Sequence, residues 1–330
     1  MNKKLISIVV PMYNEEPTLE ILYEELNKVT CMMSEYAFEY VLVNDGSKDA
    51  TLEIVKALAQ KDERVKFVSF SRNFGKEAAL LAGLQAAKGD FVATMDADMQ
   101  DPPALLPEMV AYVASGEYDN AATRRVTRKG EPVIRSFFAR MFYKMMRHMT
   151  DINIVDGARD YRVMSRQMVD SILSLQEYNR FSKGIFAWVG YETKWIEFEN
   201  RERSAGETKW SFWKLLRYSV DGIVSFSNTP INMASYLGLI LTIVSAFALF
   251  FIVGRALIFG DPVAGWPSTA SIITFIGGVQ LFVMGVMGQY ISKTYMEVKH
   301  RPHYIIKESN LKGDKYDEKR NHVYPGWIRT

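Results

Sequence analysis

Two long stretches without a charged side chain constrain the fold of this 330-residue chain more than any other feature. They cover residues 222–254 and 262–292. About twenty apolar residues cross the hydrocarbon core of a bilayer, and one charge at mid-depth costs roughly 3 kcal/mol. We therefore expect two transmembrane helices, at residues 234–258 and 268–291, rather than two buried core helices of a soluble protein.

Basic residues gather on the outer flanks of these stretches, ahead of the first and behind the second: Lys209, Lys214, Arg217, Lys293, Lys299, Arg301 and Lys307. Positively charged residues favour the cytosolic side of a membrane. The pattern predicts a multi-pass protein of the inner or plasma membrane with both termini and the soluble part in the cytosol. The apolar run of residues 5–10 is too short for a signal peptide and indicates a first β-strand.

The charge balance excludes one class of partner. The chain has 40 basic and 38 acidic residues, a net charge of +2, which lacks the excess of positive charge that a nucleic-acid binder needs. Its single cysteine, Cys31, excludes an internal disulfide and a thiolate zinc site, and we expect that side chain to be buried as a small apolar residue.

Four regions follow from these patterns. Residues 1–210 form the soluble domain, and residues 211–230 are expected to form an amphipathic helix on the membrane surface, with a plain packing helix as the alternative. Residues 231–292 hold the two transmembrane helices. Residues 293–330 form a polar cytosolic tail that we expect to be ordered only in part.

The soluble domain alternates strand-like and helix-like segments. Runs rich in β-branched and aromatic residues occupy residues 5–10, 39–44, 65–71 and 91–95. Between them, residues 17–30, 50–61 and 76–87 place apolar side chains three and four positions apart. This alternation predicts an α/β fold with a mostly parallel sheet, whose ligands bind at the carboxyl ends of the strands.

Three acidic loops follow three of the predicted strands, at residues 11–15, 45–47 and 96–100. In a parallel sheet such loops converge at one edge. Carboxylates and a glutamine amide are hard oxygen ligands suited to Mg²⁺ or Mn²⁺, which substrate phosphates usually complete. Each motif alone is weak, since an acidic residue such as Asp45 often caps a helix or turn.

In combination these motifs resemble family 2 glycosyltransferases of the GT-A fold, and within them the branch that acts on polyprenyl phosphates. The resemblance rests on the segments at residues 9–15, 43–47, 71–76 and 96–103, and the two carboxy-terminal apolar stretches resemble those of the bactoprenol glucosyltransferases. The resemblance covers about nine tenths of the chain. It implies a GT-A domain that binds a nucleotide diphosphate sugar and a lipid phosphate.

The resemblance also implies roles for individual residues. It places the nucleoside against Pro11, Tyr13, Asn14, Glu15 and Asp45, and the metal on the diphosphate against Asp96, Asp98 and Gln100. Lys76 belongs to the same donor site. Residues 203–210 resemble a loop that closes over the diphosphate, in which Arg203 and Lys209 would bind phosphate oxygens.

A second cationic segment suits the acceptor. Arg124, Arg128 and Arg135 precede an apolar helical face at residues 137–146, as expected for a site that holds a lipid phosphate at the membrane, although a solvated loop and an ordinary core face remain alternatives. Residues 156–162 resemble the family segment that ends in an acid, an aromatic residue and arginine, with Arg159 where relatives usually have glycine. This departure leaves open whether Asp156 or Asp160 faces the acceptor.

The resemblance implies an inverting transfer of a sugar to undecaprenyl or another polyprenyl phosphate, for modification of a cell-envelope glycan. The acceptor phosphate is largely dianionic near neutral pH and is already a nucleophile. Metal and arginines would neutralise the two reacting anions, and Asp160 would orient the acceptor or stabilise positive charge on the sugar. Asp96 and Asp98 complete the expected catalytic set.

The sequence constrains the identity of the sugar donor and the oligomeric state less than it constrains the reaction. A UDP-sugar is favoured, with UDP-glucose ahead of UDP-N-acetylglucosamine, a UDP-aminoarabinose type and GDP-mannose. A non-catalytic membrane scaffold or channel subunit is the alternative from another class, and the acidic and basic motifs argue against it. Small residues in the second apolar stretch favour self-association into a homo-oligomer: Gly277, Gly278, Gly285 and Gly288.

Overall fold

The central strand of the fold forms from an apolar run near the amino terminus. In the computed structural model, which describes residues 3–125, 155, 157–198, 224, 227–259 and 265–311, this run is β1 (Leu5–Met12). Ile6, Ile8 and Val10 on one face and Ser7 and Val9 on the other are fully buried. A strand whose two faces are both buried is typical of a sheet covered by helices on both sides.

Three more strands lie parallel to one another beside β1. They are β2 (Ala37–Asn44), β3 (Val65–Phe70) and β4 (Phe91–Thr94), in the spatial order β4-β1-β2-β3. The connecting helices are α1 (Glu16–Met32), α2 (Thr51–Lys61) and α3 (Lys76–Ala86). The predicted strands and helices of this part of the chain are confirmed, with ends that differ by a residue or two.

Four further strands complete the sheet, and two of them are antiparallel to their neighbours. They are β5 (Asn120–Arg125), β6 (Ala158–Ser165), β7 (Thr193–Phe198) and β8 (Ile306–Ser309). The full order is β7-β5-β6-β4-β1-β2-β3-β8, with β6 antiparallel to β4 and β5, and β8 antiparallel to β3. β5 and β7 are parallel to each other. β1 to β5 and β7 therefore run in one direction and β6 and β8 run against it, so the expectation of a mostly parallel sheet holds.

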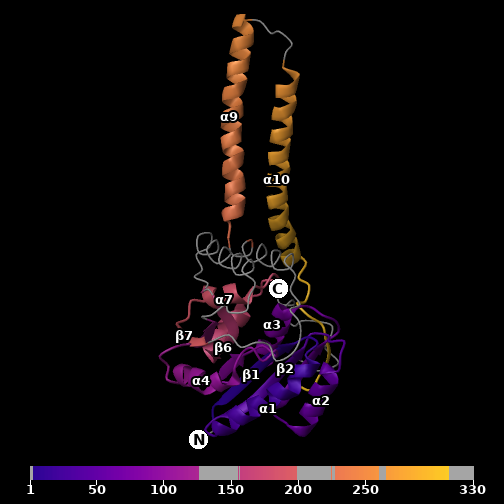
Figure 1. Ribbon diagram of the computed structural model, residues 1–330, viewed down its shortest axis with the longest axis vertical. Helices are drawn as coiled ribbons and strands as arrows, with labels where there is room; N and C mark the ends of the chain where they lie inside the picture. The colour runs from indigo at the N-terminus through magenta and orange to yellow at the C-terminus, as the bar shows by residue number, and fades with distance from the viewer. Residues whose placement is uncertain are drawn as a thin grey trace, which may run out of the picture.

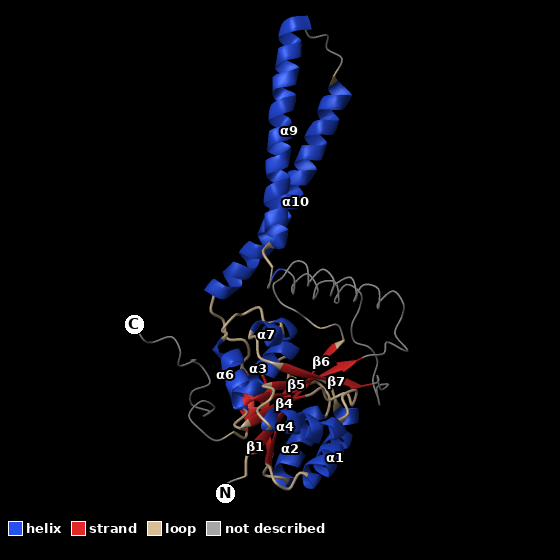
Figure 2. Cartoon of the chain, turned by 90° about the vertical axis from the view of Figure 1, so that its left-hand side faces the viewer, coloured by secondary structure: helices blue, strands red, loops and turns tan. Residues whose placement is uncertain are grey.

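Helices cover both faces of the sheet (Figure 2). One face packs against α1, α2 and α4 (Leu106–Ala114), which follows the short 3-10 helix η1 (Pro103–Leu105). The opposite face packs against α3, α6 (Arg166–Ser174) and α7 (Ser182–Trp188). The loops that carry the acidic motifs therefore lie at the carboxyl edge of the sheet, between the two layers of helices.

Two long helices project away from this domain as a hairpin (Figure 1). They are α9 (Thr229–Phe259) and α10 (Trp266–Val298), each longer at both ends than predicted. Phe250 and Leu281 are 76% and 70% exposed, so the alternative of two buried core helices is wrong. The residues of the predicted surface helix lie largely outside the described part of the chain.

One helical segment of the described residues, Phe275–Val298, has the length and composition to cross a membrane. Within α9, the apolar stretch Thr229–Leu241 is too short to cross a membrane. Both predicted segments form helices, and their membrane-spanning role stays a prediction.

The chain after α10 returns to the sheet, which the sequence analysis did not foresee. Tyr304 is 5% exposed and its ring stacks on Phe70 with centroids 4.7 Å apart. The Asn310 side chain accepts a hydrogen bond from the Phe67 amide and donates one to the Val65 carbonyl. Residues 304–310 are thus part of the folded domain, although the tail composition alone is polar and gives no strand pattern.

Replacing Tyr304 with alanine should therefore destabilise the soluble domain. Removing a buried aromatic ring costs about 3 kcal/mol or more, whereas Tyr304→Phe keeps the ring and loses the hydrogen bond to Gln85 Oε1, worth about 1 kcal/mol. The measurement is thermal unfolding of the purified full chain, followed by intrinsic fluorescence. Equal unfolding temperatures for Tyr304→Ala and wild type would show that the returning segment adds no stability.

The expectation for Cys31 is wrong, because its side chain is exposed. It lies in the last turn of α1, where Val29 and Thr30 face the sheet and are buried. Helical periodicity turns the next position toward solvent.

Candidate functional site

The three acidic loops leave the sheet at the same edge. β1, β2 and β4 are neighbours and run in parallel, with Met12 opposite Asn44 and Val9 opposite Thr94. Each loop begins within two residues of a strand end. The topology therefore brings residues 13–15, 45–47 and 96–101 to one side of the domain, as expected for a doubly covered sheet.

The first two loops are tied together by local hydrogen bonds. The Asn14 amide donates to Ser47 Oγ at 2.9 Å, and Asn14 Oδ1 accepts from the Lys48 amide at 2.8 Å. The Glu15 amide donates to Thr51 Oγ1 at 2.9 Å. Pro11, the other residue expected here, lies within β1 and is half-buried. These contacts fix the loop that was predicted to hold the nucleoside.

Asp45 is a buried anchor for the loop that enters α3. Its two carboxylate oxygens accept from the Phe74 and Gly75 amides at 2.6 and 2.9 Å, and the residue is 3% exposed. Burial raises the pKa of Asp45 to about 6, against the opposing effect of the two amides. The adjacent Gly46 has φ +64, and a Cβ there would lie 2.4 Å from the Arg72 carbonyl carbon. Asp45 thus fixes a loop that is distant in the sequence, and these contacts are not the local helix cap weighed as its alternative, since α2 begins without a side-chain cap.

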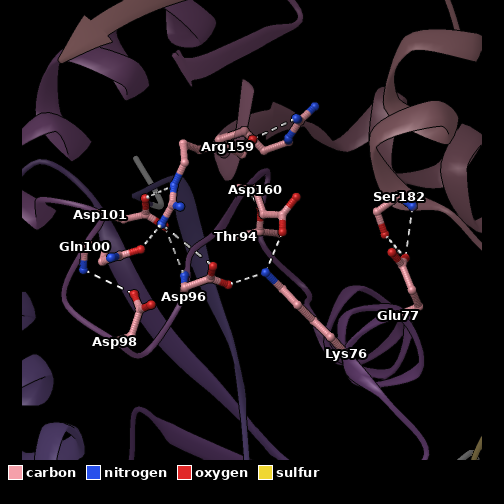
Figure 3. A network of polar contacts seen from close by, with 11 residues as sticks. Lys76, Glu77, Thr94, Asp96, Asp98, Gln100, Asp101, Arg159, Asp160 and Ser182 are labelled. Carbon is pink, nitrogen blue, oxygen red and sulfur yellow. Dashed lines mark hydrogen bonds and ion pairs between the residues drawn. The ribbon is translucent and has the colours of Figure 1, made fainter. Parts of the chain in front are cut away.

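Lys76 connects two of the predicted carboxylates (Figure 3). Its Nζ lies 2.6 Å from Asp96 Oδ1 and 2.5 Å from Asp160 Oδ2. Burial opposes the charge of Lys76, but the two carboxylates outweigh it and raise the lysine pKa. The Lys76 side chain is nevertheless 42% exposed, so it can reach a ligand that arrives from solvent.

Asp160 has one occupied and one unoccupied carboxylate oxygen. Its Oδ1 is buried and has no hydrogen-bond partner among the described residues. Burial opposes ionisation, but Lys76 and then Lys183 of α7 hold the pKa of Asp160 below its usual range. A buried charged acceptor without a partner is a candidate contact for a substrate. Asp156, the other acid considered for this place, lies outside the described residues.

The acidic loop after β4 is a tight turn. The Gln100 amide donates to Asp98 Oδ1 at 3.2 Å, and Met99 between them has φ +60. The Asp96 amide donates to Asp101 Oδ2 at 3.3 Å. Arg159 of β6 reaches into this loop and donates to Asp101 Oδ1 at 3.0 Å (Figure 3).

The loop offers oxygen ligands of the kind that a hard divalent ion needs. In the described part of the chain, no group of three or more His, Cys, Asp or Glu side chains is arranged to hold a metal. The predicted set contains two carboxylates and one amide oxygen, from Asp96, Asp98 and Gln100, on one short turn. Such a partial set fits Mg²⁺ or Mn²⁺ when phosphate oxygens supply further ligands.

Several predicted residues are not in this cluster. Arg124 is the penultimate residue of β5, where its Nη1 lies 3.8 Å from Glu197 Oε1 of the neighbouring strand β7. The remaining predicted phosphate ligands lie outside the described residues: Arg128, Arg135, Arg203 and Lys209.

Three residues of the site were not predicted from the sequence: Asp101, Arg159 and Lys183. Asp101 stands in the motif at residues 96–103, and Arg159 was noted only as a departure from the family pattern. Their contact depends on β6 lying next to β4, which no local pattern predicts. Lys183 is held near the site because the amide of the adjacent buried Ser182 donates to half-buried Glu77 Oε2 at 2.9 Å.

Comparison with known proteins agrees with this architecture. The sequence profile of glycosyl transferase family 2 matches residues 7–173. An uncharacterized glycosyltransferase of Synechocystis is 43% identical over 94% of this chain and 96% of that protein. The SfII prophage-derived bactoprenol glucosyl transferase of Shigella flexneri is 41% identical over 92% of this chain and 98% of that protein.

Among solved structures, glucosyl-3-phosphoglycerate synthase from Mycobacterium tuberculosis, in complex with Mn²⁺, UDP and phosphoglyceric acid, is similar at a TM-score of 0.45. The identity is 22%, over 67% of this chain and 76% of that protein. This likeness is too distant to support a conclusion about ligands.

Proposed function

Because this chain belongs to glycosyl transferase family 2, we propose that it transfers a hexose from a UDP-sugar to a polyprenyl phosphate, with UDP-glucose as the donor. One observation carries the choice of acceptor: the relative from Shigella flexneri that matches nearly the whole chain is a bactoprenol glucosyl transferase. The cluster of Lys76, Asp96 and Asp160 at the carboxyl edge of the sheet supports a reaction between phosphate-bearing substrates.

Asp96, Asp98 and Gln100 would hold a divalent ion, Mg²⁺ or Mn²⁺, against the diphosphate of the donor. When bound, such an ion neutralises negative charge on the leaving nucleotide. Pro11, Tyr13, Asn14 and the buried Asp45 would surround the nucleoside, together with Glu15. Arg203 and Lys209 would close over the phosphates.

Lys76 would change partners when the donor binds. In the donor-free structure its ammonium group is shared between Asp96 and Asp160. A diphosphate near Asp96 offers Lys76 a stronger negative partner, since charge-assisted contacts to phosphate are short and strong. The move would leave the Asp160 carboxylate free to face the sugar and the acceptor.

The acceptor phosphate would attack the anomeric carbon in line with the departing diphosphate, which inverts the configuration. As a dianion the phosphate needs no strong general base. Arg124, Arg128 and Arg135 would bind it, and Asp160 would stabilise positive charge that develops on the sugar ring. The unoccupied Oδ1 of Asp160 supports this role.

The helical hairpin would place this site at a membrane, with α9 and α10 as two spans and both termini in the cytosol. Large apolar side chains of both helices are exposed, including Phe247, Phe250, Leu281 and Phe282. Such a surface is expected where lipid rather than water surrounds a helix. Gly277, Gly278, Gly285 and Gly288 leave open space on α10, which supports close packing with a second copy.

The test is transfer of labelled sugar to undecaprenyl phosphate by the purified full chain in detergent. UDP-glucose, UDP-N-acetylglucosamine, a UDP-aminoarabinose donor and GDP-mannose would be compared, each with and without EDTA. We expect lipid product from UDP-glucose that EDTA abolishes. Product from another donor would reassign the sugar. No product from any donor, with folded and metal-supplied protein, would favour a non-catalytic role.

The rate should fall below about pH 6, because the second pKa of a phosphate monoester is near 6 and the monoanion is a poorer nucleophile. Asp160 should not cause this fall, since neighbouring lysines keep its pKa below the usual range. The measurement is kcat/KM for the acceptor from pH 5 to 8. A polyprenyl phosphonate, whose second pKa is higher, should move the fall to higher pH. An unmoved profile would assign it to a protein group such as Asp45, whose pKa burial raises to about 6.

A further inference from the structure

An arginine from another strand, Arg159 of β6, reaches into the acidic loop that follows β4. The side chain of Arg159 is only 19% exposed, and that of its partner Asp101 is fully buried. Arg159 comes from β6, the strand that pairs with β4 on the opposite side from β1. The guanidinium of Arg159 therefore brings a positive charge to the loop from a different part of the chain.

Arg159 contacts the loop at several points (Figure 3). Its Nε donates to Asp101 Oδ1 at 3.0 Å, and one Nη donates to Gln100 Oε1 at 3.4 Å and lies 4.0 Å from Asp96 Oδ2. The other oxygen of Asp101 accepts from the Asp96 amide. Two of the three oxygen-bearing side chains proposed as metal ligands thus lie within reach of one guanidinium.

The loop needs a cation to keep this shape. Asp96, Asp98 and Asp101 place three carboxylates within six residues, and Asp101 has no access to water. A buried carboxylate without a charged partner is strongly unfavourable. Lys76 neutralises Asp96 from the outer side but is itself partly exposed. Arginine suits the inner side, because its guanidinium is always charged and its separate donors contact two residues at once.

We propose that Arg159 stands in for the metal ion in the donor-free protein and keeps the acidic loop in its metal-binding shape. The proposal rests on the proposed function, because it assumes that the loop holds a divalent ion during transfer. With Arg159 in place, the loop keeps its shape without a metal ion until the donor binds. Without Arg159, the same loop becomes ordered only when a divalent ion supplies the missing charge.

Hydrogen exchange of the full chain in detergent tests this inference, with amides of residues 96–101 compared in EDTA and in Mn²⁺. In wild type we expect equal exchange in both conditions, within about twofold. In Arg159→Gln we expect exchange about tenfold faster in EDTA and restored to the wild-type rate by Mn²⁺, a tenfold change being about 1.4 kcal/mol. The Met95 amide, which donates to the Val9 carbonyl within the sheet, serves as an internal reference.

Three variants separate this role from a general loss of structure. Arg159→Lys keeps the charge but not the two-point contact, and should lie between wild type and Arg159→Gln. Asp101→Asn in the Arg159→Gln background removes the buried charge and should slow exchange again in EDTA. In Arg159→Gln combined with Asp98→Ala, Mn²⁺ should no longer restore protection.

Unchanged exchange in Arg159→Gln, or faster exchange that Mn²⁺ does not reverse, would overturn the inference. These outcomes are distinct from a failure of the proposed function. If the wild-type chain transferred no sugar but Arg159→Gln showed the metal-dependent protection, the proposed reaction would be wrong and the role of Arg159 would stand.

Discussion

Replacement of Asp98 by alanine is expected to lower sugar transfer by on the order of a thousandfold, because the ion on the diphosphate loses a ligand and the leaving nucleotide loses its charge compensation. The Asp98 carboxylate is half-buried, lies on a loop outside the hydrophobic core and accepts from the nearby Gln100 amide within the turn, so we expect its loss to leave the fold intact. The measurement is kcat at saturating donor, with unfolding temperature as a check.

Glu108→Ala provides a matched control for Asp98→Ala. Glu108 is an exposed acid on α4, in the same domain but on the surface. Its replacement should leave the rate within about twofold of wild type, as is usual for surface substitutions. A folded Asp98→Ala protein that kept a tenth of the wild-type rate would contradict the assignment of Asp98 as a metal ligand.

Asp160→Asn is expected to reduce kcat by about a hundredfold to a thousandfold, with a much smaller change in the KM for the donor. The substitution keeps the size of the side chain but removes the charge that faces Lys76 and Lys183. Under the proposed mechanism, it removes an interaction with the positive charge that develops on the sugar ring in the transition state rather than a contact made in the ground state.

Asp170→Asn is the control for the second prediction, since Asp170 also forms an ion pair, 3.0 Å from Arg166 on α6, but is 65% exposed. Surface ion pairs contribute little, so this variant should behave as wild type. A kcat for Asp160→Asn equal to that of Asp170→Asn would remove Asp160 from the mechanism. A rise in donor KM with unchanged kcat would assign it to donor binding.

The parts of the fold that could be predicted are those encoded by local patterns. β1 to β4 are buried on both faces, so their sequences are short continuous apolar runs, and α1 to α3 carry apolar residues at helical spacing. β6 and β8 were missed because their place depends on antiparallel partners far along the chain. Glu308 of β8, for example, pairs with Ser69 of β3.

In the site, too, local patterns predict some features and long-range pairing decides the others. That the acidic loops share one edge follows from parallel strands alone, so the grouping of Asp45 and Asp96 could be predicted. The partners within the site could not. Arg159 meets Asp101 because Arg162 lies opposite Thr94 in the β4–β6 pairing, and this register is invisible in either segment alone.

The contacts between the soluble domain and the end of α10 affect how a lipid acceptor would reach the site. Glu297 in the last turn of α10 accepts hydrogen bonds from the Tyr178 amide, and His303 stacks on the Tyr178 ring. Tyr290 donates to the Ser227 carbonyl at 2.6 Å, which ties the start of α9 to α10.

The contacts of Tyr178 hold the domain against the end of α10. In the membrane arrangement proposed above, they would keep Asp160 at a set height over the bilayer. The phosphate headgroup must rise to meet the sugar, and only the isoprene units next to it leave the hydrocarbon. Selection among lipids of different length would therefore depend on those first units and not on the remote end of the chain.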